Sequence, residues 1–498
     1  MLVAAAMLLG TAWMGDDAFI TLRVIDNFVN GYGLRYNVLE RVQVFTHPLW
    51  LMFLTPFYAL TREPLATTML ASVAVSLGAL WLLAARIAKD IVFGCLLVLL
   101  AVASTAIYQF STSGLETPLT FLLLALLVWQ LQQVQKMWIP AAIIGLLLFN
   151  RLDLAVLVGP AATYLFFKAK GQRIRVALAI TLPALAWMVF SVVYYGAPFP
   201  NTAYAKLGTG YGTGELVSHG LAYTQDFALH DPLLALVIGK AVFDAARSSD
   251  WTTRLSGLGI VLYLAYTIVI GGDFMSGRFF AAPGFLAFCL IACQPAPRWL
   301  INRAKMVAPV LFVVVGALLA SRLMAHEVSA LPESGIRDER NFYYADLGLV
   351  PVLHRWVSTG TEPVPVLGVR GEELKAIAQR AGDYYAVAVL SAGLLGYYGG
   401  PMVHIVDMLA LTDPFLARLP AIAGSRVGHY RRKIPAFYTE TVTEANPATN
   451  IAALRPLLND ITLAVRAPLF AEGRWQAIWR LASGQYAWVY DSDLDRIR

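Results

Sequence analysis

Two adjacent carboxylates, Asp16 and Asp17, stand directly against the end of an apolar run in "GTAWMGDDAFITLR". Side chains of this type can ligate magnesium or calcium when oxygen-rich partners are close by. The simpler interpretation is that they cap the helix expected from "DDAFITLRVIDNFVNG", because the dipole at a helix N-terminus favours acidic residues. Gly31 is a plausible stop for that helix. Capping explains one carboxylate well, but it leaves the second without a reason.

Acid, base and hydroxyl groups also gather in five other short polar stretches. These are Glu116 in "STSGLETP", Arg151 and Asp153 in "NRLD", Asp273 and Arg278 in "GGDFMSGR", Asn201, Tyr204 and Lys206 in "PFPNTAYAK", and His47 in "RVQVFTHPLW". Each has a simple structural interpretation when taken singly. Glu116 would cap a helix, Arg151 and Asp153 would form a local ion pair, and His47 would be an interfacial histidine.

The composition is that of a polytopic α-helical membrane protein. Of 498 residues, 58% are hydrophobic and only 14% are charged, and the mean hydropathy is +0.61, which is too apolar for a soluble chain of this length. The formal net charge of +6 comes from lysines and arginines scattered through short loops, so it indicates membrane topology and not nucleic-acid binding. The three cysteines all lie in apolar segments, so no disulfide framework or zinc site is indicated.

Eleven apolar segments are long enough to cross, or nearly cross, a bilayer. They lie at about 1–14, 65–86, 91–107, 118–134, 138–150, 152–167, 175–195, 232–246, 255–271, 279–294 and 305–322. A further stretch at about 48–61 carries two prolines and would be a short span or an interfacial helix. The first run is short and lacks a basic flank, as expected of a chain whose start lies upstream. A signal peptide is the alternative, but "GDDAF" is no cleavage site.

The distribution of basic residues decides the topology. If 48–61 does not cross, nearly every basic cluster falls on the cytoplasmic side, as positive charges in membrane proteins do. We therefore predict about eleven transmembrane helices, with the amino terminus inside and the carboxy terminus outside. The same topology brings all of the polar stretches to the outer face. So many polar loops on one face predict a polar cavity at the membrane surface.

The composition changes at about residue 326. The segments "YYAVAVLSAGLLGYY" and "HIVDMLAL" predict short buried strands followed by turns or helices, which is an α/β pattern. We predict a transmembrane catalytic domain at 1–325 and a C-terminal extracytoplasmic α/β domain at 326–498. In the second domain, "GSRVGHYRRKIPAFY" places Arg431 and Arg432 among aromatic residues. This segment is either a solvated charged loop or a contact for the acceptor or a lipid phosphate.

The ordered set of motifs resembles that of the GT-C glycosyltransferases, which take sugars from polyprenyl phosphate carriers. More narrowly, the chain is similar to the polyprenyl-phosphate-dependent arabinofuranosyltransferases, a family with mycobacterial terminal and pilin-modifying members. The motifs that carry the likeness are "GDDAFITLRVIDNFVNGYGLRYNVLERVQVFTHPLW", "TSGLETPL", "NRLDLAVLVGP", "PFPNTAYAK", "GGDFMSGRFF" and "VDMLALTDPFLAR".

The resemblance implies the fold, the reaction and the place of this protein. The fold would be GT-C, in the bacterial inner membrane, with the active site and the C-terminal domain facing the periplasm. The donor would be decaprenyl- or undecaprenyl-phosphate-linked arabinofuranose, and the acceptor an extracytoplasmic glycan or protein. A general base near the acceptor hydroxyl contributes about two to four orders of magnitude in rate. That role falls on Asp16 or Asp17, and Asp16 is favoured because it lies closer to the membrane.

The resemblance also carries roles onto the other polar residues. The leaving phosphate needs cations and hydrogen-bond donors, and the candidates that bind the donor and its phosphate are His47, Arg151, Lys206 and Arg278. The candidates that bind the sugar and the acceptor are Glu116, Asp153, Asn201, Tyr204, Asp273, Arg431 and Arg432.

No cofactor is expected to be required, because a prenyl monophosphate donor needs a metal less than a pyrophosphate donor does. A divalent metal at Asp16 and Asp17 remains the alternative. Two other functions compete with arabinofuranose transfer. The first is a GT-C transferase for mannose or aminoarabinose, because the motifs do not report hydroxyl configuration. The second is a secondary transporter, which would place its charges in mid-span, whereas here the charges collect at one face.

Overall fold

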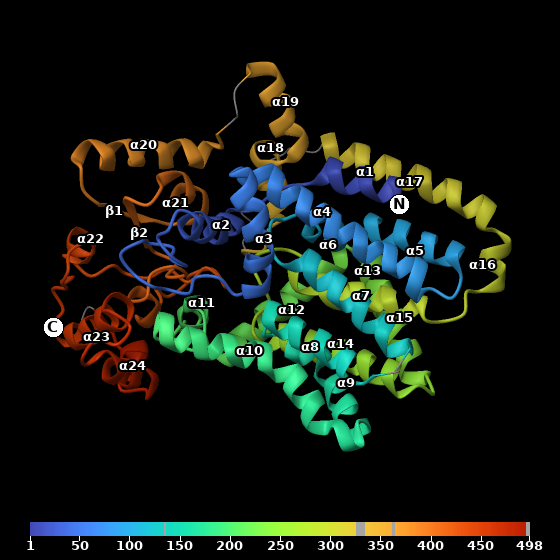
Figure 1. Ribbon diagram of the computed structural model, residues 1–498. Coiled ribbons are helices and arrows are strands. Elements are labelled where there is room, and N and C mark those ends of the chain that lie inside the picture. Colours follow the sequence, from blue (N-terminus) through green and yellow to red (C-terminus); the bar gives the residue numbers. More distant parts are fainter. Residues whose placement is uncertain (134–135, 325–333, 361–363, 495–498) are drawn as a thin grey trace.

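The computed structural model describes the chain except for residues 134–135, 325–333, 361–363 and 495–498. Helices pack side by side through most of the molecule, while the elements that follow residue 365 gather at one end (Figure 1). The predicted domain boundary between residues 325 and 326 lies outside the described residues. The division into two domains therefore stays a prediction.

Every predicted apolar span is helical over most of its length. These helices are α1 (Leu2–Thr11), α4 (Pro64–Leu82), α5 (Ile91–Ala103), α7 (Thr117–Gln133), α8 (Trp138–Asn150), α9 (Leu154–Lys168), α10 (Arg173–Tyr195), α13 (Pro232–Arg247), α14 (Trp251–Val269), α15 (Arg278–Ala292) and α17 (Ala304–Met324). The stretch with two prolines forms α3 (Pro48–Thr61). Among the described residues, three helical stretches are long and apolar enough to cross a membrane, at 64–87, 170–195 and 251–269. The other apolar helices are shorter, so the count of about eleven spans stays a prediction.

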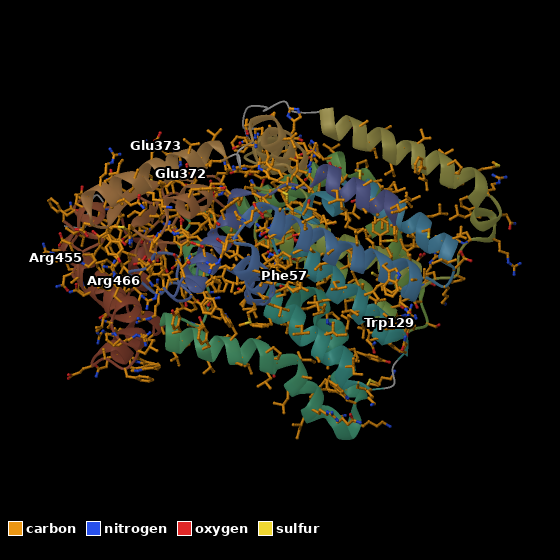
Figure 2. All side chains as sticks on the ribbon, turned by 45° about the horizontal axis from the view of Figure 1, so that its top comes forward. Phe57, Trp129, Glu372, Glu373, Arg455 and Arg466 are labelled. Atoms are coloured by element: carbon orange, nitrogen blue, oxygen red, sulfur yellow. The ribbon has the colours of Figure 1, made fainter. Side chains whose placement is uncertain are left out.

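Exposed apolar side chains along α10 fit a membrane protein. Ile174, Leu182 and Val189 follow one another at about two helical turns, so they share one side of α10, and all three are largely exposed. A long helix that shows this much apolar surface is typical of contact with lipid. Several charged side chains lie at the end of the molecule that the C-terminal elements form. Figure 2 shows Glu372 and Arg455 there, away from Phe57 in the helical body.

Further α-helices lie between or after these apolar helices in the sequence. They are α2 (Asp16–Val29), α6 (Thr105–Phe110), α11 (Asn201–Ala205), α12 (Thr213–His230), α16 (Arg298–Asn302), α18 (Glu339–Leu347), α19 (Leu349–Thr359), α20 (Val366–Ala381), α22 (Tyr438–Thr441), α23 (Arg455–Arg466) and α24 (Arg474–Ala482). As the sequence predicts, a helix begins at the acidic pair and ends just before Gly31.

The strands predicted after residue 326 are present. β1 (Tyr385–Val389) and β2 (Val403–Asp407) are parallel, and α21 (Gly393–Gly399) connects them. Their register runs from Tyr385 opposite Val403 to Val389 opposite Asp407. β2 is buried throughout, and the buried residues include its two polar members, His404 and Asp407. Both strands end at the same edge, and the segments that follow them lie together there.

Arg23 on α2 joins the strand segment to the first part of the chain. Its buried guanidinium donates to the carbonyl oxygens of Tyr36 at 2.8 Å, Gly396 at 2.8 Å and Val403 at 2.6 Å. A buried guanidinium is stable only when its donors are satisfied in this way. A Cβ atom at Gly396 would lie 2.3 Å from the Tyr36 hydroxyl, so only glycine allows this approach. The contact brings the ends of both strands next to the N-terminus of α2.

Candidate active site

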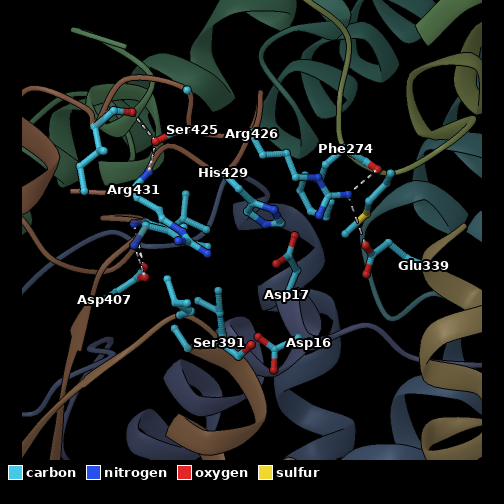
Figure 3. Close-up of a pocket in the computed structure, with 18 of the residues that line it drawn as sticks. Asp16, Asp17, Phe274, Glu339, Ser391, Asp407, Ser425, Arg426, His429 and Arg431 are labelled. Atoms are coloured by element: carbon cyan, nitrogen blue, oxygen red, sulfur yellow. Dashed lines mark hydrogen bonds and ion pairs between the residues drawn. The ribbon is translucent and has the colours of Figure 1, made fainter. Parts of the chain in front are cut away.

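A polar cavity of about 490 Å³ lies where α2 meets the carboxyl ends of β1 and β2. Its other walls come from the loop before α15, from α18 and from the segment 422–431, as Figure 3 shows. The polar residues that line it are Asp16, Asp17, Glu339, Ser391, Asp407, Ser425, Arg426, His429 and Arg431. The carboxyl ends of parallel strands are a common place for ligands because the loops that follow them can diverge. The polar cavity expected from the sequence is therefore present.

Asp16 is committed to the backbone of α21. Its carboxylate accepts hydrogen bonds from the amide nitrogen of Gly393 at 2.9 Å and of Leu394 at 2.8 Å. Asp16 thus caps a helix that lies far away in the sequence, not the helix that it begins. A Cβ atom at Gly393 would lie 1.8 Å from the Asp16 carbonyl oxygen, so glycine is required there. With both carboxylate oxygens engaged, Asp16 has a structural role in this arrangement.

Asp17 faces the cavity with its carboxylate free of such bonds. Its side chain is 26% exposed, and the nearest cationic atom, Arg278 Nη1, lies 3.9 Å from its Oδ2. Burial raises the pKa of Asp17 to about 6, although the charges of Arg278 and Lys206 oppose this rise. Such a carboxylate is largely ionised at neutral pH and is more basic than an ordinary aspartate. The preference for Asp16 that the sequence suggested therefore moves to Asp17.

Arg278 and Asp273 stand beside Asp17, as the motif "GGDFMSGR" predicts. Nη1 of Arg278 lies 3.4 Å from Oδ2 of Asp273, while Oδ1 of Asp273 accepts from the amide of Phe274 at 2.8 Å. Nε of Arg278 is buried and has no hydrogen-bond partner within the described ranges. Neither Arg278 nor Asp273 lines the cavity, so Arg278 acts on the site through the positive charge that it places beside the two carboxylates.

The wall opposite Asp17 consists of aromatic and weakly charged groups. The ring of His429 stacks on that of Phe274 with a centroid distance of 3.8 Å, and it faces Asp17 in Figure 3. Burial lowers the pKa of His429 to about 4, so its ring is neutral. Burial also raises the pKa of Glu339 to about 7, and Arg426 Nη2 lies 3.9 Å from this carboxylate. Burial likewise raises the pKa of Asp407 to about 6, so the cavity holds three carboxyl groups whose pKa values lie near neutrality, which is common at functional sites.

Arg431 and Asp407 line the same cavity but differ in how they are paired. The Asp407 carboxylate accepts from the amides of Leu409, Leu411 and Thr412 at 2.8, 2.8 and 3.1 Å, so it shapes the turn after β2. The guanidinium of Arg431 is exposed, and the described part of the chain offers it no hydrogen bond or ion pair. The guanidinium of Arg431 is therefore available to an anion, while its role in binding stays a prediction.

Four predicted ligands form a buried network behind α2 and do not line this cavity. His47 Nδ1 lies 3.1 Å from Glu116 Oε2, and Arg151 donates to Glu116 Oε1 at 2.8 Å. Arg151 also binds Asp153, which accepts from the Tyr263 hydroxyl at 2.8 Å. Burial alone would raise the pKa of Glu116, but Arg151 and His47 hold it well below its usual range. The structural interpretations of these residues therefore fit better than roles in binding donor or sugar.

Three further candidates are engaged elsewhere. Asn201 Nδ2 donates to the carbonyl oxygens of residues 410, 411 and 413 at 2.9, 3.2 and 3.0 Å. Tyr204 packs its ring under the guanidinium of Arg418 at 4.6 Å. Arg432 is buried and donates to the carbonyl oxygens of residues 205, 207 and 430. These contacts hold the cavity loops in place, so the structure does not bring the three side chains to the cavity.

Lys206 is exposed and does not line the cavity, but it lies close enough for its charge to lower the pKa of Asp17 and of His429. Lys206 thus belongs to the electrostatic surroundings of the site. No group of three or more histidine, cysteine or acidic side chains that could hold a metal occurs in the residues described here.

Sequence reasoning did not assign Glu339, Tyr343 or Asp407 to the site. Asp407 could have been found, because it ends a predicted buried strand, where a carboxylate commonly faces a ligand site. Glu339 and Tyr343 lie one turn apart on α18, and their sequence carries no comparable signal. His429, which also lines the cavity, lies within the basic segment "GSRVGHYRRKIPAFY" that the sequence singled out.

Comparison with curated proteins finds two relatives that cover most of the chain. The terminal β-(1→2)-arabinofuranosyltransferase of Mycobacterium tuberculosis is 25% identical, over 92% of this chain and 89% of that protein. The protein of the same name from Corynebacterium glutamicum is 25% identical, over 84% of this chain and 72% of that protein. No family model matches the chain, and no solved structure matches it. The comparisons confirm the predicted resemblance to the arabinofuranosyltransferases and the prediction of a glycosyltransferase enzyme.

Proposed function

We propose that this protein transfers arabinofuranose from a polyprenyl-phosphate donor, such as decaprenyl- or undecaprenyl-phosphoarabinofuranose, to a hydroxyl of an extracytoplasmic glycan or glycoprotein. The observation that carries the proposal is the free Asp17 carboxylate beside Arg278 in a polar cavity. The names of both relatives support arabinose as the sugar, and they do not favour mannose, aminoarabinose or a transporter. We further propose a GT-C fold in the bacterial inner membrane, with the cavity open to the periplasm.

Asp17 acts as the general base in this proposal. Its carboxylate accepts the proton of the acceptor hydroxyl, and the acceptor oxygen forms the new bond to the anomeric carbon. The bond from that carbon to the phosphate oxygen breaks, and the phosphate leaves with the electron pair. A pKa of about 6 suits this role, because the group is ionised at neutral pH and still takes a proton readily. Arg278 balances the charge of the base before the proton arrives.

Arg431 is the group best placed to hold the leaving phosphate. Its exposed guanidinium lines the cavity, and no hydrogen bond or ion pair to it occurs within the described residues. Arginine suits phosphate because its planar fork donates two hydrogen bonds at once. Arg426 is less available, because it already binds the carbonyl oxygens of Gly335 and Phe274. The rings of His429 and Phe274, tilted by 32° to each other, provide aromatic surface of the kind that packs against a sugar.

The test is turnover by the purified full-length protein with synthetic prenyl-phosphate sugars. An arabinan oligosaccharide serves as acceptor, and the arabinofuranose donor is compared with the mannose donor at equal concentration. We expect transfer from the arabinofuranose donor, and loss of that transfer in the Asp17→Asn variant. Faster turnover of the mannose donor would replace arabinose by the competing sugar. Turnover of neither donor would remove the proposal.

A further inference from the structure

Two tryptophans form an exposed apolar surface on α24, in the part of the chain for which the motifs above offer no role. Trp475 is 41% exposed and Trp479 is 73% exposed. They lie four residues apart, so they share one side of the helix. Ala477 and Ile478 on the other side are buried. Large aromatic side chains exposed together in this way usually mark a contact surface.

This surface lies beside the end of α10, the helix whose exposed apolar side chains are typical of contact with lipid. A Cβ atom at Gly196, which ends α10, would lie 3.3 Å from both Ala464 of α23 and Ile478 of α24. Arg474 at the start of α24 donates to the carbonyl oxygen of Tyr194 at 3.3 Å. Figures 1 and 2 both show α24 next to the C-terminal end of α10. Helix α24, which carries the two exposed tryptophans, therefore lies directly beside the end of α10.

The depth of α24 follows from the position of the exposed side chains on α10. The last of these is Phe190, and Tyr195 follows five residues later. Five residues span about 7.5 Å along an α-helix. The polar layer of a bilayer is roughly 5–7 Å thick on each side of the hydrocarbon core. The end of α10, and α24 beside it, thus lie at the level of the headgroups.

We propose that α24 docks on the outer surface of the lipid bilayer, with Trp475 and Trp479 inserted among the headgroups. Tryptophan is enriched at this level because its ring is apolar and its N–H is polar. The contact does not depend on anionic lipid, because the nearby cations are already paired. Arg480 binds Asp460 at 2.6 and 2.7 Å, and Arg474 binds the carbonyl oxygens of residues 464 and 469. This docking goes beyond the transfer reaction and needs no donor.

The test measures the depth of a spin label on the full-length protein in nanodiscs of phosphatidylethanolamine and phosphatidylglycerol. Labels are attached to Trp479→Cys and, as the matched control, to Glu372→Cys on α20, which is exposed at another edge (Figure 2). Cys95 and Cys293 are replaced beforehand, while the fully buried Cys289 is kept. We expect the ratio of collisions with oxygen to collisions with a nickel chelate to be several-fold higher at 479 than at 372.

Two results would overturn the docking. The first is a label at 479 that meets the nickel chelate as often as the label at 372, which would place α24 in water. The second is protection at 479 from both reagents with dipolar broadening between labels, which would indicate contact with a second copy of the chain.

A second measurement covers the case in which labelling disturbs the fold. Lipids with brominated acyl chains should quench a larger fraction of the tryptophan fluorescence in the wild type than in a Trp475→Ser, Trp479→Ser variant of unchanged melting temperature. Equal fractional quenching would contradict the proposal. Because neither measurement uses a sugar donor, failure of the docking and failure of the proposed transfer are distinguishable.

Discussion

Two groups of charged residues lie on either side of α2, and they are paired very differently. In the buried network, Glu116 has Arg151 at 2.8 Å and His47 at 3.1 Å. In the cavity, the nearest cationic atom to Asp17 lies 3.9 Å away. The pKa of Glu116 is accordingly well below its usual range, whereas that of Asp17 rises to about 6. Close cationic partners keep Glu116 ionised, whereas the more distant cation beside Asp17 leaves that carboxylate able to exchange a proton near neutral pH.

The physical reason is the cost of burying charge. A buried carboxylate with close partners recovers the hydration that it lost, so it stays ionised and does not accept a proton. A buried carboxylate with a distant partner recovers only part of that hydration, so its affinity for a proton increases. The same residue type therefore serves two purposes within one end of this molecule.

The largest expected effect is on the acidic pair, Asp16 and Asp17. Asp17→Asn keeps the size of the side chain but removes the base, so turnover should fall about a hundredfold or more while membrane yield and melting temperature stay unchanged. Asp16→Asn should instead lower the free energy of unfolding by about 1–2 kcal/mol, because one acceptor for the amides of α21 is lost. The melting temperature should fall with it. Steady-state turnover and thermal melting of both variants distinguish loss of the base from loss of stability. If both turn over within about threefold of wild type, Asp17 is not the base, and Asp273 becomes the next candidate.

The second variant tests the buried network. Glu116→Gln removes the charge that pairs with Arg151 and His47, so it should destabilise the folded protein by about 3 kcal/mol. The fraction that remains folded should keep most of its turnover, because Glu116 does not line the cavity. Thermal melting in detergent is compared with turnover per folded molecule, and Tyr263→Phe serves as a milder control. Unchanged melting with lost activity would place Glu116 at the reacting groups.

The pH dependence sharpens the assignment of the base. A general base works only when it is ionised, so kcat/KM should fall about tenfold for each pH unit below the pKa of Asp17, near 6. Glu339 and Asp407, whose pKa values rise to about 7 and about 6, are carboxyl groups of the same cavity that titrate in this range, and Asp407 is held by three backbone amides. The acid limb should therefore persist at the same pH in Glu339→Gln. A limb that moves or disappears in this variant would transfer the base role to Glu339.

A smaller effect separates two neighbouring arginines. Arg431→Ala removes the unpaired cation on the cavity lining, so KM for the donor should rise about tenfold while the fold is kept. Arg432→Ala should leave KM unchanged and lower the melting temperature, because three carbonyl oxygens lose their donor. Kinetics and melting of the two variants are compared side by side. The reverse pattern would show that Arg432 contacts the substrate.

The smallest expected effect concerns metal. Because Arg278 already lies beside Asp17 and Asp273, we expect turnover to continue in the presence of EDTA. The measurement is turnover before and after chelation, followed by addition of magnesium. Full loss that magnesium restores would show that a divalent cation takes part at the acidic pair.

Much of the local structure could be predicted from the sequence. Uninterrupted apolar runs such as 175–195 predict helices because they are long enough to cross a bilayer, and α10 occupies that run. The alternation between short apolar runs and glycine-rich turns after residue 384 predicts β1, α21 and β2. The polar motifs also predicted a shared polar cavity, and Arg278 of "GGDFMSGR" lies 3.9 Å from Asp17. All of these patterns are local, and local patterns survive folding.

Other features depend on contacts between distant segments. Asp16 and Asp17 are chemically alike and adjacent, and nothing nearby in the sequence separates their roles. Their difference comes from Gly393 and Leu394, whose amides reach Asp16 from 377 and 378 residues away. His47 and Arg151 were predicted to bind the donor because their partner in the folded protein, Glu116, lies far from both in the sequence. Their pairing with Glu116 could not be seen from the local sequence.

The sequence by itself determined that this chain is rich in apolar helices, that it carries most of its charged residues outside the apolar segments, and that it resembles arabinofuranosyltransferases. Hydropathy, period and motif order are properties of residue types along the chain, so they need no fold to be seen. Only the tertiary structure decided which carboxylate is free, which arginines are already bound and where the cavity opens. Those outcomes depend on burial and on distances between side chains, and both arise only when distant segments pack together.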